Sequence, residues 1–352
     1  MDNENAPIKY YENAFDLLRL ICAMQVLFGH YVEHFKLYNV ANCFDNMLQI
    51  SQFVPGRGVI VFFAISGYLA VRSVEKSSDF IRYAIKKLKR IYPELIIAFL
   101  INTIIICIVY KIDCSVKDFL IYSLTQLTIF QFYTGDWLRG YGAGTANGAL
   151  WTISVIIQFY VLSFFLINYI SKCKKRCIYL YLIAVGVSVI GSNCNHVLPI
   201  IAYKLFTVSV FPYLHIFLLG VFCYYYNDKI FPLIKRNWIL ILIIYVLVRC
   251  LVIEIISVSN WNFGVNYDVF SAMLLSILTI GAAYILGNIH FRYEISYGIY
   301  IYHMIYVNIG LEMLYKFGWE NQNVVLVATL AFLATLITSL MSNIYTKRLL
   351  HK

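Results

Sequence analysis

The chain has 352 residues, of which 61% are hydrophobic and only 13% are charged, and it carries a formal net charge of +10 at pH 7. About a quarter of the residues of a soluble domain are charged, so this composition, with a mean hydropathy of +0.73, excludes an ordinary soluble protein. The positive charge is typical of the cytoplasmic loops of a membrane protein, and we expect no nucleic-acid partner.

The first apolar segment, FDLLRLICAMQVLFGHY (15–31), contains Asp16, Arg19 and His30. An Arg or Asp near the middle of a membrane span costs roughly 2.5–3.5 kcal/mol, so such residues indicate function. Arg19 precedes His30 by about three helical turns, or about 16 Å along a helix. We therefore expect both side chains on one side of a transmembrane helix, with Asp16 one turn before Arg19.

Further apolar runs recur along the chain, and each is long enough to cross about 30 Å of hydrocarbon. They predict an all-α, polytopic membrane protein with about ten transmembrane helices. The predicted spans are 13–35, 56–73, 92–110, 149–170, 178–194, 201–225, 237–257, 267–288, 295–315 and 323–344. The stretch 117–134 is short and broken by polar residues, so we interpret it as re-entrant or interfacial, with an eleventh span as the alternative.

The distribution of Lys and Arg predicts the orientation. If 117–134 does not cross, one side of the membrane holds about nineteen of these residues and the other about seven, which places both termini in the cytoplasm. The inner loops are then those around 72–91, 171–177, 226–236, 289–294 and 345–352. The polar segment 1–12 lacks the features of a signal peptide. We expect a single membrane-embedded domain over 1–352 with no appended soluble domain.

The nine cysteines show no spacing typical of a metal site, and we expect no bound metal. Cys43, Cys114 and Cys194 lie towards the predicted outer side, where a disulfide is an open alternative.

Five segments share a wider pattern: the first helix with Asp16, Arg19 and His30, then GRGVIVFFAISGYL (56–69), KKLKRIYP (86–93), NGALWTISVIIQFY (147–160) and ISYGIYIYHM (295–304). In composition and order they resemble the motifs of the acyltransferase family three, multispan bacterial membrane enzymes that O-acylate carbohydrates. One position departs from the family pattern: Ile156 stands where the family usually has a Glu, and the nearest polar residue is Gln158.

The resemblance implies an acyltransferase of the bacterial cytoplasmic (inner) membrane. It would move an acyl group, most simply acetyl from acetyl-CoA, to a hydroxyl of a surface polysaccharide, lipopolysaccharide or lipid-linked carbohydrate. The expected partners are acyl-CoA, this carbohydrate acceptor and membrane lipid, and no permanently bound cofactor is expected.

Acyl transfer needs a base for the hydroxyl proton and a stabiliser for the developing oxyanion. We expect His30 to be the base and Arg19, beside Asp16, to orient the donor or the oxyanion. The alternatives are a structural histidine and an Arg–Asp pair that neutralises itself.

The basic residues Lys86, Lys87 and Arg90 are candidates for binding coenzyme A phosphates, and Lys87 and Arg90 share a helix face. Their alternative role is in topology and contact with anionic lipid. The possible acceptor or pocket residues are Arg57, Ser66, Trp151, Gln158, Tyr300 and His303. Each of these has a packing or anchoring alternative, since Ser66 with Gly67 suits close helix contact and Trp151 suits the membrane interface.

The missing Glu leaves two further possibilities. Glu94, Glu254 or Asp268 takes its place, or the chain is an impaired member that binds a glycan. A transporter or flippase would also carry ionisable groups within the membrane, but the inverted repeats frequent in such proteins are not evident in the sequence.

Overall fold

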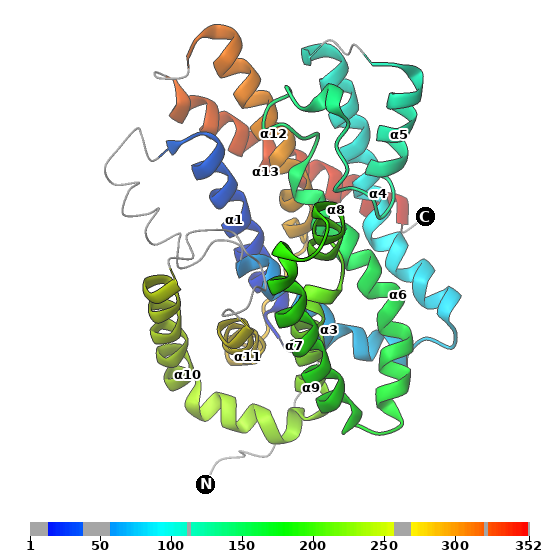
Figure 1. Ribbon diagram of the computed structural model, residues 1–352, viewed down its shortest axis with the longest axis vertical. Helices are drawn as coiled ribbons and strands as arrows, with labels where there is room; N and C mark the ends of the chain where they lie inside the picture. The colour runs from blue at the N-terminus through cyan, green and yellow to red at the C-terminus, as the bar shows by residue number, and fades with distance from the viewer. Residues whose placement is uncertain (1–12, 38–56, 111–113, 257–268, 320–322, 351–352) are drawn as a thin grey trace. The chain divides into compact units, whose positions relative to one another are not determined.

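Helices account for all the regular secondary structure of the described chain. The computed structural model describes residues 13–37, 57–110, 114–256, 269–319 and 323–350, and these ranges contain no strand (Figure 1). The predicted all-α class is therefore confirmed.

The helices follow one another in the order α1 Phe15–His34, α3 Arg57–Glu75, α4 Phe80–Ile105, α5 Val116–Gln126, α6 Trp151–Ser171, α7 Arg176–Asn193, α8 Ile200–Thr207, α9 Leu214–Tyr225, α10 Asn227–Ile256, α11 Val269–Ile285, α12 Ser296–Phe317 and α13 Val324–Leu350. A π-helical turn, η2 (Ile106–Tyr110), extends α4, and the short 3-10 turns are η3 Asp136–Leu138, η4 Gly148–Leu150, η5 Cys194–His196 and η6 Phe211–Tyr213. Every predicted span overlaps at least one of these helices, and α5 covers the first part of the stretch 117–134.

Seven helical segments in the described part of the chain are long and apolar enough to cross a membrane. An eighth span forms if α8 and α9, bent by 47° at their junction, are counted together. The sequence predicted about ten. The predicted span 201–225 is the bent pair, α11 is a shorter apolar helix, and α12, which covers most of the predicted span 295–315, is not among the candidate spans. Large apolar side chains face outward, among them Ile190 at 67% and Ile239 at 71% exposure, as lipid-facing helices require.

Helix α4 begins earlier than predicted. The sequence suggested a basic loop to residue 91 and a span from residue 92, but α4 starts at Phe80 and contains the whole basic run. The carboxylate of Asp79 accepts hydrogen bonds from the backbone N–H of Arg82 and the hydroxyl of Ser78, both at 2.9 Å. These bonds hold the pKa of Asp79 below its usual value and cap the helix. Helix α10 begins at Asn227 and is kinked at Asn237, whose backbone is not helical (φ −109°, ψ 15°), so the predicted start of the span at residue 237 coincides with this kink.

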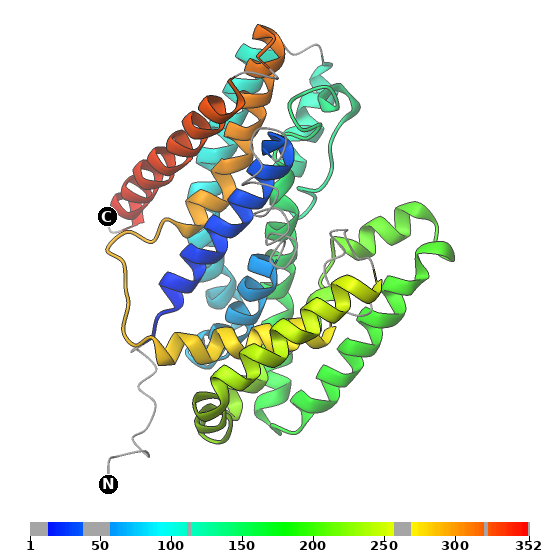
Figure 2. The ribbon, with the colours of Figure 1, turned by 90° about the vertical axis from the view of Figure 1, so that its left-hand side faces the viewer.

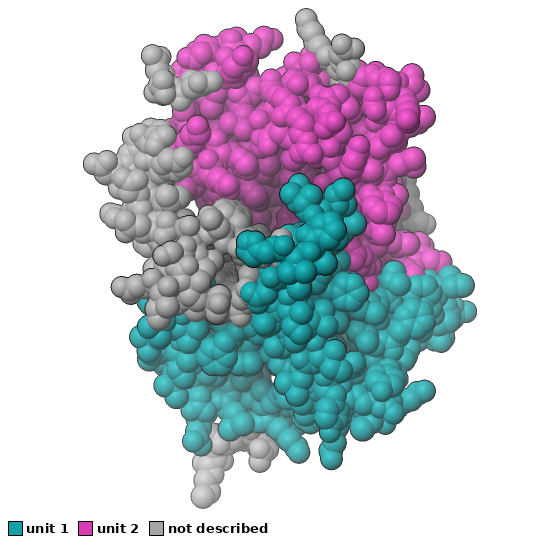
Figure 3. Space-filling model, viewed as in Figure 1, with its two compact units in different colours: residues 1–22, 56–83, 161–292 teal, residues 23–55, 84–160, 293–352 magenta. Residues whose placement is uncertain are grey.

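The chain divides into two compact units, each assembled from segments that are distant in sequence (Figure 3). The first unit contains Met1–Cys22, Gly56–Tyr83 and Val161–Arg292, and the second contains Ala23–Pro55, Ala84–Tyr160 and Tyr293–Lys352.

In the first unit, α3 and α9 are in backbone contact. A Cβ atom on Gly67 would lie 2.0 Å from the carbonyl oxygen of Phe217, and one on Gly220 would lie 2.2 Å from that of Ala64. Only glycine fits at both positions, as is common where membrane helices approach closely. The packing role that we considered for the Ser-Gly pair is therefore present at Gly67.

In the second unit, α12 and α13 lie side by side (Figures 1 and 2). The hydroxyl of Tyr302 donates to that of Ser342 over 2.8 Å, and a Cβ on Gly298 would lie 2.9 Å from the Cβ of Ser339. Helix α1 joins this pair because the hydroxyls of Tyr31 and Thr335 are hydrogen-bonded at 3.1 Å.

The segment between α5 and α6 is tied to α12. The backbone N–H of Gly142 donates to the Glu312 carboxylate at 2.8 Å, and that of Ala143 donates to the Asn308 side chain at 2.9 Å. Asn308 also donates to the carbonyl oxygens of Thr145 and Ala146. Asn147, which caps η4, donates to the carbonyl of Ile301 at 2.7 Å. These bonds fix how the chain enters α6.

Candidate active site

A row of polar side chains crosses the second unit. It begins at Thr152 on α6, whose hydroxyl is 2.7 Å from that of Tyr300 on α12. The ring of Tyr300 lies 6.0 Å from that of His303, and His303 lies 5.2 Å from His30 on α1, measured between ring centroids. We call these four residues the polar row. Three helices supply it, and His303 within it is completely buried.

The hydrogen bonding of His303 determines where its lone pair lies. Its Nδ1 is 3.2 Å from the carbonyl oxygen of Ile299, and because a carbonyl only accepts, Nδ1 carries the proton. The neutral ring then has its lone pair on Nε2. Nε2 is buried and has no hydrogen-bond partner among the described residues. A proton-accepting nitrogen therefore lies beside His30.

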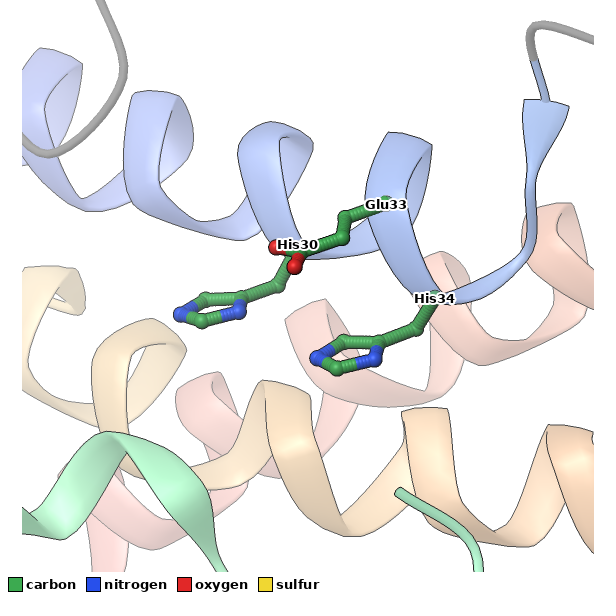
Figure 4. A group of neighbouring side chains, drawn as sticks. All are labelled: His30, Glu33 and His34. Carbon is green, nitrogen blue, oxygen red and sulfur yellow. The ribbon is translucent and has the colours of Figure 1, made fainter. Parts of the chain in front are cut away.

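Helix α1, which carries His30, packs against α13. Besides the Tyr31–Thr335 hydrogen bond, the rings of Phe28 and Phe332 stack with centroids 5.8 Å apart. His34 follows one turn after His30, and their rings are nearly parallel with centroids 5.6 Å apart. Figure 4 shows both imidazoles on the same side of α1, with Glu33 between them in sequence.

The predicted residues Trp151 and Gln158 both lie on α6 and are partly buried. Trp151 is next to Thr152, the first member of the polar row, and Ile156 lies between the two predicted residues in the chain. The motifs NGALWTISVIIQFY (147–160) and ISYGIYIYHM (295–304), which are distant in the chain, meet at the Thr152–Tyr300 hydrogen bond.

Asp16 and Arg19 belong to the first unit. Arg19 Nη1 is 3.5 Å from Asp16 Oδ1, as the one-turn spacing predicted. The other carboxylate oxygen, Oδ2, accepts a hydrogen bond from His290 Nδ1 at 3.0 Å. Helix α1 is continuous from Phe15 to His34, so Arg19 and His30 are on one helix as predicted.

The basic residues of α4 differ in whether they contact other residues of the second unit. Lys86 and Lys89 are exposed. Lys87 Nζ lies 5.0 Å from the ring centroid of Tyr160, and Arg90 Nη2 is 3.9 Å from a carboxylate oxygen of Glu294. Lys87 and Arg90 thus have partners within the second unit, and the Arg90 side chain is still 54% exposed.

Of the three carboxylates that could take the place of the family's Glu, Glu94 is the one whose side chain the structure describes. Glu94, on α4, is buried and accepts a hydrogen bond from the Asn343 side chain at 3.3 Å. The same Asn343 nitrogen donates to the backbone carbonyl of Glu294 at 2.9 Å. The side chain of Glu254 and the whole of Asp268 lie outside the described residues.

Two other predictions, on Arg57 and Cys43, fall outside the described residues in whole or in part. Arg57 begins α3, but its side chain is not described, whereas Ser66 is partly buried in α3. Cys43 is likewise outside the described residues, so the disulfide alternative stays untested. Cys22, Cys177 and Cys223 are buried within the first unit.

Sequence reasoning missed several neighbours of the predicted residues. Thr152 was part of a quoted motif but was not named as a site residue. His34 and Glu33 form an H-x-x-E-H pattern with His30, a signal that was available in the sequence. The pairing of His290 with Asp16 had no sequence signal, because it joins distant segments.

Comparisons with known proteins agree with these motifs. The model of a family described as an acyltransferase domain matches residues 12–343. Nodulation protein 10 of Rhizobium leguminosarum bv. viciae is 27% identical over 330 residues, which cover 88% of this chain and 85% of that protein. An O-acetyl transferase of Shigella phage Sf6 is 23% identical over 295 residues, covering 82% and 83%. No solved structure shows a significant match.

Proposed function

Because the chain belongs to the acyltransferase family three, we propose that this membrane acyltransferase moves an acetyl group from acetyl-CoA to a hydroxyl of a cell-surface or lipid-linked carbohydrate. The relative named O-acetyl transferase supports acetyl as the group transferred. The proposed setting is the bacterial cytoplasmic membrane, with the donor on the cytoplasmic side.

The observation that carries the proposal is the contact between His30 and His303 within the polar row. In the proposed reaction, His30 accepts the proton of the sugar hydroxyl as that oxygen attacks the thioester carbon. A carbon–oxygen bond forms, the carbon–sulfur bond then breaks, and the leaving thiolate takes the proton from His30. His303 is proposed as a positioning residue, since its buried ring packs against that of His30.

The remaining roles follow from the resemblance. Arg19, paired with Asp16, is proposed to orient the donor through a phosphate or carbonyl oxygen, which a guanidinium binds in two-pronged fashion. Lys87 and Arg90, with Lys86 nearby, are proposed to bind the phosphates of coenzyme A. The exposed fraction of Arg90 leaves its guanidinium accessible to such a ligand.

A second candidate function is glycan binding without acyl transfer, and the specific observation that favours it is Ile156 in place of the family's Glu. Glu94 is the described carboxylate that would compensate in the enzyme. It is buried in the same unit as the polar row.

The test measures acyl transfer in membranes that contain the full chain. These membranes are supplied with radiolabelled acetyl-CoA and with surface glycans of the bacterium that expresses the chain. We expect labelled ester on the glycan with the wild-type chain, loss of this label with His30→Ala, and retention with His196→Ala. His196 is a matched control, being an exposed histidine in η5. Equal labelling by His30→Ala would reject the proposed base, and glycan binding without any ester would favour the second function.

A further inference from the structure

The C-terminal turn of α1 brings together three metal-binding side chains. His30, Glu33 and His34 each offer one ligand atom, and these atoms all lie within 4.8 Å of one another. Residues four apart on a helix share a face, so both imidazoles can reach a common point. Figure 4 shows the two rings side by side with the Glu33 carboxylate close to His30.

Imidazole nitrogens and a carboxylate oxygen are the ligands that Zn²⁺ takes in many proteins, at about 2.0–2.2 Å. Tetrahedral coordination at that bond length holds ligand atoms about 3.3 Å apart. The present separations therefore need to shorten by about 1.5 Å, which rotation of the side chains can supply. Glu33 is exposed and both histidines are partly exposed, so an ion can reach the group.

His303 provides a second, independent observation. Metal-bound histidines usually donate the N–H of one ring nitrogen to a carbonyl or carboxylate, which leaves the other nitrogen for the metal. His303 has this arrangement: Nδ1 donates to Ile299, and the buried Nε2 has no hydrogen-bond partner in the described part of the chain. Its ring centroid is 5.2 Å from that of His30.

We propose that His30, Glu33 and His34 bind a divalent transition-metal ion of the zinc type, with His303 as an adjacent fourth donor. We call this group the α1 metal site. The sequence expectation of no bound metal rested on the spacing of the cysteines, whereas this proposal rests on two histidines and a glutamate.

Metal binding at this position regulates the proposed reaction, and this part of the inference depends on His30 being the base. A nitrogen whose lone pair is bound to a metal does not accept a proton. Zinc therefore inhibits acyl transfer by occupying His30, and a chelator restores the activity.

The binding test uses the full-length protein purified in detergent micelles and titrated with ZnCl₂ by calorimetry. We expect one zinc ion per chain, and affinity lowered at least about tenfold by Glu33→Gln or His34→Asn, because even the loss of a residue that supports a metal ligand typically costs that much. His196→Asn is the matched control and should bind as the wild type does. Titration with MgCl₂ should give no comparable heat of binding, because Mg²⁺ prefers oxygen ligands and loses its bound water molecules reluctantly. Unchanged zinc affinity in both site variants would overturn the α1 metal site.

A second measurement separates this inference from the proposed function. Glu33→Gln should retain acyl transfer in the presence of chelator and should resist zinc at concentrations that inhibit the wild type. Zinc binding that requires Glu33 and His34, in a chain without acyl transfer, would reject the proposed function and leave the metal site standing. Zinc inhibition equal in wild type and Glu33→Gln would reject the regulatory role.

Discussion

The imidazole ring of His303 lies 5.2 Å from that of His30, although the two belong to α12 and α1. This contact joins the first and the last of the sequence motifs in the second unit. It also makes the His303 ring a direct neighbour of the proposed base, so the properties of one histidine depend on the presence of the other.

We therefore predict that His303→Phe lowers kcat for acyl transfer by about 10²-fold, a value typical for impaired general base catalysis. The KM for acyl-CoA should change little, since His303 is not proposed to contact the donor. The phenylalanine ring fills the volume that the imidazole leaves, so the packing of α12 should be kept. The apparent Tm of the variant in detergent checks this and should be close to that of the wild type. A variant that keeps wild-type kcat would remove His303 from the mechanism.

The basic face of α4 gives a prediction about donor binding. Replacing both Lys87 and Arg90 with Gln should raise the KM for acyl-CoA about tenfold, equivalent to about 1.4 kcal/mol, with kcat unchanged. The effect should diminish at high ionic strength, because salt screens exposed charges. Lys204→Gln, which changes an exposed lysine of α8, is the control. If the double variant and Lys204→Gln had the same KM for acyl-CoA, the basic face of α4 would have no role in binding the donor.

The Glu94–Asn343 pair gives a prediction about stability. Asn343→Leu removes the described donor to the buried Glu94 carboxylate, and leaving such a group without its partner costs about 1–3 kcal/mol. The apparent Tm should fall accordingly. Replacing Glu94 as well, by Leu, should recover part of the loss, since exchanging both partners of a buried pair for apolar groups is often near neutral. If the double variant were less stable than Asn343→Leu, the hydrogen bond would not be the stabilising feature.

The contact of α3 with α9 gives the largest expected effect. Gly67→Ala would place Cβ 2.0 Å from a backbone oxygen, which the backbones must separate to accommodate, and so we expect little folded protein on size-exclusion chromatography. Gly186→Ala on α7 is the matched control, because a Cβ there meets no atom within 4 Å. That change should stabilise the helix by roughly 0.5–1 kcal/mol. Normal yield of Gly67→Ala would show that the helices are further apart.

Local pattern was enough to predict the helices, because apolar runs and helical period are properties of neighbouring residues. The Asp16–Arg19 pair also follows from one-turn spacing and is present. The start of α4 was misjudged, since a run of lysines and arginines is compatible with both a loop and an exposed helix face. The polar row and the His290–Asp16 bond depend on which helices pack together, and this information is not contained in local spacing. The H-x-x-E-H pattern of His30, Glu33 and His34 is visible in the sequence, and its one-turn spacing alone places both imidazoles on one face of a helix.

The hydrogen bonds of Asn308 and Asn147 join the segment before α6 to α12, and this has a practical consequence for engineering the chain. They align the approach to α6 with α12, and Thr152 follows within one turn and a half of Asn147. Extra residues inserted between Gly142 and Asn147 would shift Thr152 out of register with Tyr300, whereas an epitope tag placed near His196, on the exposed turn after α7, would leave that alignment intact.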